Sequence, residues 1–203
     1  MRPSEPGEES DWDLAQRAKG GDEAAFEDLI LRYQAPIQSF VFRSTLDEQT
    51  ARDLTQEVFV RAWFALGRVQ AKAQFSTWLF QIAVNLCRDH AKSKASKNAR
   101  VTQSFSPQTG DDRSEDREFA SPQPSPAQNI ESKEALESLE TEIKTLPLEL
   151  RSPFILGAVE QRSHKEVAAI LGMSAKAVEV RIYRARRLLC ERLALLGFKP
   201  RNK

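Results

Sequence analysis

The side chains best suited to binding chemistry are cations gathered near the C-terminal end of the chain. Residues 176–203 hold nine Lys or Arg against two Glu, an excess of seven positive charges. A surface of this kind neutralises the phosphates of a nucleic acid backbone. The competing interpretation is an ordinary solvated helix face, which accounts for most runs of charge. The cations are Lys176, Arg181, Arg184, Arg186, Arg187, Arg192, Lys199, Arg201 and Lys203.

Two successive helices are predicted to position these cations. Ser163 and Glu166 form an S-x-x-E capping box, which predicts that a helix begins at His164. Gly172 supplies the left-handed conformation that ends this helix, and Ser174 caps the next one. The second helix carries one apolar stripe at steps of three and four residues: Val178, Ile182, Ala185, Leu189, Leu193 and Leu196. Because the cations lie on its other faces, the pattern indicates a helix-turn-helix that docks on DNA.

A polar stripe and a basic, aromatic-rich segment stand out in the N-terminal half. Asp53, Gln56, Glu57 and Arg61 recur at steps of three and four, so they share one face of a helix predicted from about residue 48 to 66. A further helix is predicted to begin near Phe75, with an apolar face that turns basic toward residues 88–100.

Composition narrows the functional class. With 40% apolar and 29% charged residues in 203 positions, the chain has the composition of a soluble globular protein of one or two domains. The sequence contains two cysteines and two histidines, which are too few for a disulfide framework or a zinc site. They are Cys87, Cys190, His90 and His164. We expect no enzyme, cofactor or metal, both cysteines buried or half-buried, and no membrane insertion. The polar N-terminus is unlike a secretory signal, so we expect a cytoplasmic protein.

The predicted fold class is all-α, with two small helical domains joined by a flexible linker. A helix capped by Asp22 runs to about Phe42, and Gly67 ends the helix that begins near Glu48. Residues 95–130 are rich in Ser, Gln, Pro and acids, which is typical of a linker. Domains are therefore predicted at 1–94 and 131–203, the second beginning with helices over 130–145 and 148–159 and carrying 14 basic against 10 acidic residues.

Three motifs in this order carry a resemblance to a known family. Residues 53–63 read DLTQEVFVRAW, residues 75–85 read FSTWLFQIAVN, and residues 178–186 read VEVRIYRAR after a Leu-Pro at 146–147. With these motifs the chain closely resembles bacterial RNA polymerase sigma factors, specifically the extracytoplasmic-function (ECF) group of the sigma-70 family. The resemblance covers about residues 12–94, as region two, and 131–195, as region four.

The resemblance implies three binding surfaces and two kinds of partner. It implies that Asp53, Gln56, Glu57 and Arg61 grip the clamp of the largest subunit of core RNA polymerase, and that region four meets the flap of the second-largest subunit. The minus-ten promoter element would be read and opened by Gln74, Ser76, Thr77, Asn85, Arg88 and Lys92. The minus-thirty-five element would be bound by Ser174, Lys176, Arg181, Tyr183, Arg184 and Arg187. Besides polymerase and promoter DNA, an anti-sigma factor is expected to hold the free protein.

The sequence departs from the family pattern in both domains. Residues 89–94 read DHAKSK where many relatives have an arginine pair, which leaves the phosphate contacts there in question. Glu179 and Val180 replace a basic and a hydroxyl residue, so the base preference of the second helix is not carried over. The acidic cluster at 111–118 either mimics nucleic acid in a basic channel or keeps the linker soluble, and both interpretations stay open.

Two functions of other classes are weaker hypotheses. A stand-alone helix-turn-helix regulator that binds duplex DNA as a dimer explains residues 146–195 but leaves the two N-terminal motifs unexplained. A nuclease would need a cluster of carboxylates or histidines with metal-ligand spacing, whereas Asp53 and Glu57 share a helix face without further partners nearby.

Overall fold

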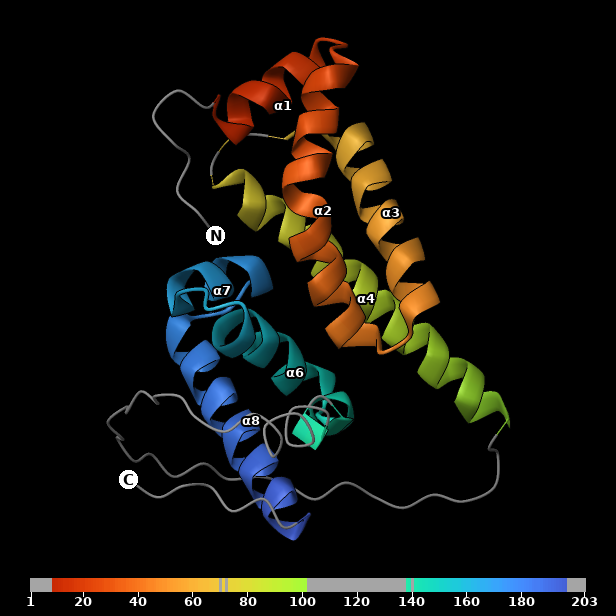
Figure 1. Cartoon of the computed structure of the whole chain (residues 1–203), viewed down its shortest axis with the longest axis vertical. Coiled ribbons are helices and arrows are strands. Elements are labelled where there is room, and N and C mark those ends of the chain that lie inside the picture. Colours follow the sequence, from red (N-terminus) through yellow and green to blue (C-terminus); the bar gives the residue numbers. More distant parts are fainter. Residues whose placement is uncertain (1–8, 70, 72, 102–137, 140, 197–203) are drawn as a thin grey trace, which may run out of the picture.

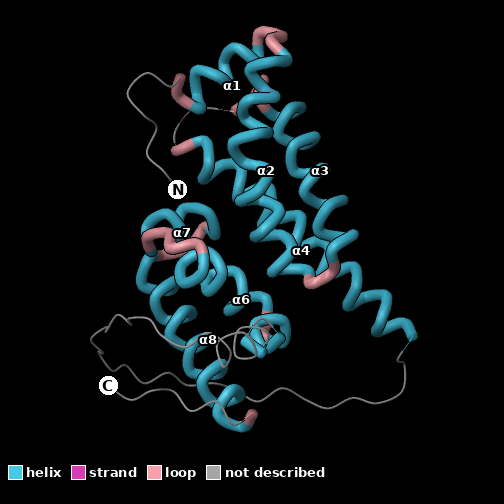
Figure 2. Tube along the Cα trace, in the orientation of Figure 1, coloured by secondary structure: helices cyan, strands magenta, loops and turns pink. Residues whose placement is uncertain are grey.

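The described part of the chain is built from helices alone. The computed structural model describes residues 9–69, 71, 73–101, 138–139 and 141–196. Within them every regular element is helical, and the helices form an N-terminal group, α1 to α4, and a C-terminal group, α6 to α8 (Figure 1). The trace coloured by secondary structure shows short loops within each group (Figure 2). The predicted all-α fold class is confirmed.

Side-chain caps set the starts of the first three helices. α1 (Asp11–Lys19), α2 (Glu23–Thr45) and α3 (Glu48–Ala65) each begin after a residue whose side chain accepts an amide of the first turn: Ser10, Asp22 and Asp47. The predicted cap at Asp22 and the predicted helix from Glu48 are confirmed. α1 is missing from the sequence-based expectation, although Ser10 followed by two acids is a helix-start signal.

The core of the N-terminal group is formed by apolar faces of α2, α3 and α4 (Phe75–Val101). Phe40 of α2 meets Phe80 of α4 edge to face, with ring centroids 5.7 Å apart. α1 is fastened from two sides, because Trp12 donates to the Ala73 carbonyl at 2.8 Å and Tyr33 donates to the carboxylate of Asp11. The start of α4 is thereby held among α1 and α2.

α4 is longer than the sequence suggests. It continues to Val101, beyond the predicted domain boundary at residue 94 and into the predicted linker 95–130. The rest of that linker, with its acidic cluster, and the first half of the helix predicted over 130–145 lie outside the described residues. The second half of that helix is present, since residues 141–145 are helical.

The C-terminal group begins with α6 (Leu148–Phe154), which continues into a wider π-helical turn, η1 (Ile155–Val159). Pro153 lacks a backbone N–H, and the next bonds shift register, so that the N–H of Glu160 donates to the Ile155 carbonyl at 2.9 Å. Gly157 allows close packing there, because a Cβ at this position would lie 2.5 Å from Cδ1 of Ile182. The predicted helix over 148–159 is confirmed, with this change of pitch.

The helix-turn-helix is formed by α7 (His164–Leu171) and α8 (Ala175–Leu195), as predicted. Ser163 and Glu166 make both bonds of the capping box, and Gly172 is left-handed with φ of 66°. The first four residues of the predicted apolar stripe of α8 are buried. Its far end is not, because Leu193 is half-buried and Leu196 is 56% exposed beyond the reach of α6 and α7.

Candidate nucleic-acid interface

The polar stripe of α3 lies on the surface as one face. Arg61 donates from Nε to Glu57 at 2.7 Å, and Asp53 accepts from Gln49 at 2.9 Å. Gln56 is exposed on the same side. Exposed pairs of this kind contribute little to stability, so this face is available for an interaction with a partner.

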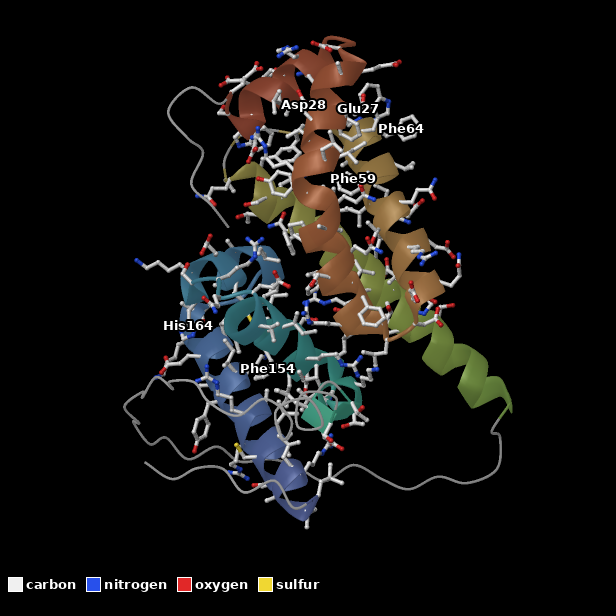
Figure 3. All side chains as sticks on the ribbon, in the orientation of Figure 1. Glu27, Asp28, Phe59, Phe64, Phe154 and His164 are labelled. Carbon is white, nitrogen blue, oxygen red and sulfur yellow. The ribbon has the colours of Figure 1, made fainter. Side chains whose placement is uncertain are left out.

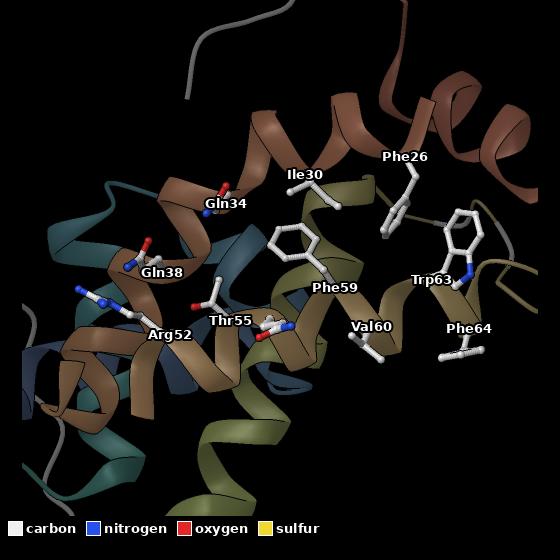
Figure 4. A pocket seen from close by; sticks show the side chains of 11 residues that line it. Phe26, Ile30, Gln34, Gln38, Arg52, Thr55, Phe59, Val60, Trp63 and Phe64 are labelled. Atoms are coloured by element: carbon white, nitrogen blue, oxygen red, sulfur yellow. The ribbon is translucent and has the colours of Figure 1, made fainter. Parts of the chain in front are cut away.

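An apolar groove of about 660 Å³ runs beside this stripe, between α2 and α3 (Figure 4). Gln56 belongs to the polar stripe and also lines the groove, so the stripe and the groove are continuous. Phe64 is 77% exposed and Val60 is 43% exposed at its rim, which is unusual for side chains of this size. Neither belongs to the predicted site, although Val60 and Phe64 follow Gln56 at four-residue steps. The lining is completed by Phe26, Ile30, Gln34, Gln38, Arg52, Thr55, Phe59 and Trp63.

α4 brings only part of the predicted minus-ten set to the surface. Gln74, Asn85 and Lys92 are exposed and Arg88 is half-buried. Asn85 therefore presents an amide, which offers a donor and an acceptor together, on the outside of a helix that also carries two cations. These four residues remain candidates for contact with nucleic acid.

Ser76 and Thr77 are the two members of the predicted site that the structure buries. Their exposed fractions are 0% and 4%, because each shares the face of α4 that carries Phe80 into the core. The Ser76 hydroxyl is buried without a hydrogen-bond partner. Neither side chain is therefore accessible on the surface of this structure. The sequence pattern around the helix start does not distinguish a buried hydroxyl from an exposed one.

α8 displays the predicted minus-thirty-five residues in two rows. Arg181 and Arg184 are one turn apart, while Lys176, Tyr183 and Arg187 follow one another along the adjacent row. Tyr183 is 50% exposed. Two of these cations pair with acids on the same helix, since Lys176 lies 3.4 Å from Glu179 and Arg187 lies 3.2 Å from Glu191.

The start of α8 is shaped for an anion. The Ser174 hydroxyl accepts the Ala177 N–H at 3.1 Å, which makes Ser174 a helix cap rather than a free surface hydroxyl. A helix N-terminus with exposed cations beside it favours phosphate. Arg181 is held at Met173, because its Nη1 donates to the Met173 sulfur at 3.4 Å.

A cleft that the sequence did not predict joins the two groups of helices. It has a volume of about 420 Å³ and is lined by Arg88 and Lys92 of α4 together with Arg181 of α8. Candidate residues for two different DNA elements therefore line one cleft. α7 lies beside α4 where the two groups of helices meet, as the view with all side chains shows (Figure 3).

The two cysteines differ in exposure. Cys87 is buried and burial raises the pKa of its thiol to about 12, whereas Cys190 is exposed, contrary to the expectation of a buried or half-buried side chain. In the described ranges, no three His, Cys, Asp or Glu side chains gather where they would hold a metal ion. The described helices also include none with the length and apolar character that a membrane span requires.

Comparison with known proteins gives the family. Residues 29–97 match the family described as Sigma-70 region 2, and residues 136–189 match the one described as Sigma-70, region 4. The chain is 31% identical to RNA polymerase sigma-H factor of Pseudomonas aeruginosa, over 88% of this chain and 91% of that protein. It is 33% identical to ECF RNA polymerase sigma-E factor of Escherichia coli K12, over 87% and 91%.

A solved structure agrees with these relatives in fold. The structure of CnrH in complex with the cytosolic domain of CnrY superposes with a TM-score of 0.63 at 28% identity, over 93% of this chain and 98% of that one. Both matched regions thus occur in the same order and in a similar arrangement of helices. The chain belongs to the extracytoplasmic-function group of the sigma-70 family of bacterial RNA polymerase sigma factors.

Proposed function

We propose that this sigma factor binds core RNA polymerase through its N-terminal domain, reads the minus-ten element with α4 and reads the minus-thirty-five element with α8. The observation that carries the proposal is the exposure of most members of three residue sets, on α3, α4 and α8. The protein catalyses nothing itself, and it acts in the bacterial cytoplasm, where the polymerase meets the chromosome. The N-terminal domain begins at residue 1 and reaches past the predicted boundary at residue 94 to the end of α4 at Val101. The C-terminal domain is 131–203.

Polymerase binding is assigned to α3 and to the C-terminal domain. Asp53, Gln56, Glu57 and Arg61 supply acceptors and donors along two turns of one exposed helix face, which suits a coiled coil such as the clamp of the largest subunit. The adjoining apolar groove adds contact area that the polar residues alone lack. The C-terminal domain is assigned to the flap of the second-largest subunit.

Minus-ten recognition is assigned to Gln74, Asn85, Arg88 and Lys92. Strand opening needs binding energy that is available only from unstacked bases, because separating each step costs a few kcal/mol. The Asn85 amide suits a base edge, and the cations suit the adjacent phosphates. Ser76 and Thr77 are assigned instead to the packing of the start of α4.

Minus-thirty-five recognition is assigned to α8. In this proposal Arg181, Tyr183 and Arg184 contact base edges, while Lys176 and Arg187 contact the phosphates. Ser174 contributes by fixing the helix start. Glu179 lies among these residues and pairs with Lys176, so the base preference of this helix differs from that of relatives with a basic residue there.

An anti-sigma factor is proposed as a second protein partner. CnrH, which is similar to this chain along nearly its whole length, was solved in complex with the cytosolic domain of CnrY. The exposed apolar groove between α2 and α3 would leave the free chain with an unfavourable surface, and a partner that covers it in the absence of polymerase resolves this.

Run-off transcription tests the assignment. Core polymerase is supplied with this chain, or with Asn85→Ala or Arg181→Ala, on a library of genomic fragments. New start sites are expected only when the protein is added. A lost base contact weakens binding by about 1–3 kcal/mol, or roughly 5- to 150-fold in affinity. Asn85→Ala should weaken the downstream contact and Arg181→Ala the upstream one.

Matched substitutions keep this test specific. Gln16→Ala removes an exposed amide from α1, and Arg68→Ala removes an exposed guanidinium far from α8; both should transcribe like the parent chain. If the chain neither binds core polymerase nor starts transcription, but binds duplex promoter by itself, the stand-alone regulator becomes the better account.

A further inference from the structure

The peptide group that leads into α4 is held by a side chain of α1. Trp12 donates from its indole Nε1 to the Ala73 carbonyl, 61 positions further along the chain, at 2.8 Å. This carbonyl comes before the backbone ladder of α4, in which the Trp78 N–H donates to the Gln74 carbonyl at 3.2 Å. Because a peptide group is planar, a bond that fixes the Ala73 carbonyl also fixes the direction in which the backbone enters Gln74.

The indole ring of Trp12 is anchored separately from its N–H. It meets the Phe75 ring edge to face, with centroids 5.4 Å apart, and lies 6.3 Å from the Trp78 ring. Phe75 is 2% exposed and also lies 5.6 Å from the Tyr33 ring of α2. Aromatic rings at such distances attract one another beyond the burial of their area. Trp12 therefore has two separable parts, a ring that packs on the core and an N–H that holds a peptide group.

α1 is itself fixed on α2 through its first residue. The Asp11 carboxylate accepts from Arg32 at 2.5 Å and from the Tyr33 hydroxyl. The side chains of Asp11 and Arg32 are 21% and 31% exposed, so salt screens this pair less than it screens a pair on the open surface. Burial raises the pKa of the Tyr33 phenol, and Asp11 raises it further, so the hydroxyl stays a donor at neutral pH. Trp12, the next residue, is therefore supported by the core of the N-terminal group.

Gln74 is the candidate minus-ten residue that depends on this arrangement. Its side chain is exposed directly before α4, and its amide offers a donor and an acceptor to a base edge. A mobile backbone would have to be ordered when DNA binds, and the entropy lost would reduce the affinity. A backbone that Trp12 already holds avoids this loss. Asn85 has no such need, because it lies within α4, where the helix fixes its backbone.

We propose that Trp12 is a positioning residue for minus-ten recognition, which acts through Gln74 and does not contact the promoter itself. The inference rests on the proposed function for its consequence, because the placement of Gln74 matters only if Gln74 reads the minus-ten element. The bond between Trp12 and Ala73 does not depend on that function. In this view α1 belongs to the recognition site, since it orders the residue that precedes the recognition helix.

Hydrogen exchange tests the bond in the free, full-length protein. The chain has three tryptophans, so nitrogen-15 labelling of tryptophan gives three indole N–H signals in a magnetic resonance spectrum. Trp12→Phe removes one of these signals and thereby assigns it. In the parent chain that proton should exchange with deuterium on the order of tenfold more slowly than in a free indole. Exchange at the free rate would overturn the positioning bond.

Promoter binding tests whether Trp12 acts through Gln74. The probe is a single-stranded oligonucleotide of the minus-ten element from a mapped start site, added to polymerase assembled with each variant. Trp12→Phe keeps an aromatic ring without the indole N–H and should weaken binding about two- to tenfold, the range of one neutral hydrogen bond. In a Gln74→Ala background the same substitution should change the affinity little, because the side chain that it positions is gone. An equal loss in both backgrounds, or no loss in either, would overturn the proposal.

Trp78→Phe is the matched control. It removes an indole from the same ring cluster and leaves the Trp12 N–H and the Ala73 carbonyl in place. This variant should bind the oligonucleotide like the parent chain, and a loss as large as that of Trp12→Phe would assign the effect to ring packing instead. If the parent chain neither starts transcription nor binds the oligonucleotide, the sigma function fails, whereas the exchange rate still decides whether Trp12 holds the peptide group.

Discussion

Two helices carry the residues assigned to DNA, and they divide their surfaces differently. α4 packs against α2, α3 and α7, so that core side chains take most of its circumference and Asn85 lies on a narrow exposed strip. α8 packs mainly against α6 and α7, and one apolar row anchors it while two polar rows stay outside. The difference shows that burial, more than residue type, decides which polar side chains of a helix can bind.

Each of these helices contains one cysteine, and the largest expected effect is the difference between the reaction rates of the two thiols. Cys87 of α4 is 3% exposed and has a pKa near 12, while Cys190 of α8 is exposed. Since the thiolate is the nucleophile, Cys87 should react only through opening of the core, which costs several kcal/mol. At pH 8, iodoacetamide should modify Cys190 at least about a thousand times faster, because each 1.4 kcal/mol is a factor of ten.

Mass spectrometry of peptides over a time course measures both rates. In guanidinium chloride the two cysteines should react at similar rates, which serves as the control. Comparable rates in the native protein would mean that the inner face of α4 is not packed as described, and the contrast between the helices would disappear.

Adjacent residues of α8 provide the second test. Ile182 is buried at 4% exposure beside Gly157, and Tyr183 is 50% exposed. Ile182→Ala should lower the free energy of unfolding of the C-terminal domain by about 2–5 kcal/mol. Tyr183→Ala should change it by less than about 0.5 kcal/mol while weakening DNA binding. Urea denaturation followed by circular dichroism measures both, and equal losses would contradict the division of α8 into buried and binding rows.

Sequence patterns predicted α8 well because its signals are local. Ser163, Glu166, Gly172 and Ser174 act within one turn of their own positions, so the capping box and turn could be read directly. Leu196 was predicted as buried because periodicity continues to it, but the neighbouring helices do not reach that far.

The surfaces of the N-terminal domain were harder to predict because they depend on tertiary packing. Ser76 and Thr77 are polar residue types that usually lie on the surface, but both side chains are buried in the core. The groove beside Phe64 arises from the angle between α2 and α3, which no single helix pattern specifies. Likewise, the contact of Arg162 with Phe80 joins two domains far apart in sequence, and neither residue has a distinctive neighbourhood.

The capping box of α7 allows a smaller, pH-dependent test. Hydrogen bonds from the Ser163 hydroxyl and backbone lower the pKa of Glu166. A carboxyl whose folded pKa is lowered contributes stability above its unfolded pKa of about 4.3, and loses it as pH falls through the lower folded value. Ser163→Ala should cost about 1 kcal/mol at pH 7, and part of this loss should vanish below pH 4 or thereabouts.

Ser174→Ala is the matched control for this test. Ser174 caps α8 but has Ala177 at the position that Glu166 occupies in the box, so no carboxyl is coupled to it. Its substitution should cost a similar amount of stability with little dependence on acid. Urea midpoints measured from pH 7 down to pH 3 compare the two. The same acid dependence in both variants would rule out Glu166 as the cause.

The smallest effect is expected at Ser76, a buried polar residue of α4. Its hydroxyl is fully buried and has no hydrogen-bond partner, so Ser76→Ala removes an uncompensated polar group. The free energy of unfolding should stay unchanged or rise by up to about 1 kcal/mol. Thr55→Val, which removes another buried hydroxyl without a partner on α3, should act in the same direction. Thermal melts of both variants measure this change.

Transcription distinguishes the two roles that α4 residues can have. Run-off synthesis with Ser76→Ala should equal that of the parent chain, whereas Asn85→Ala should reduce it. A Ser76→Ala chain that is stable yet fails to open promoters would mean that the start of α4 leaves the core when DNA binds. In that case the buried, unpaired hydroxyl would be held ready for a base, and the division of α4 described here would apply to the free protein alone.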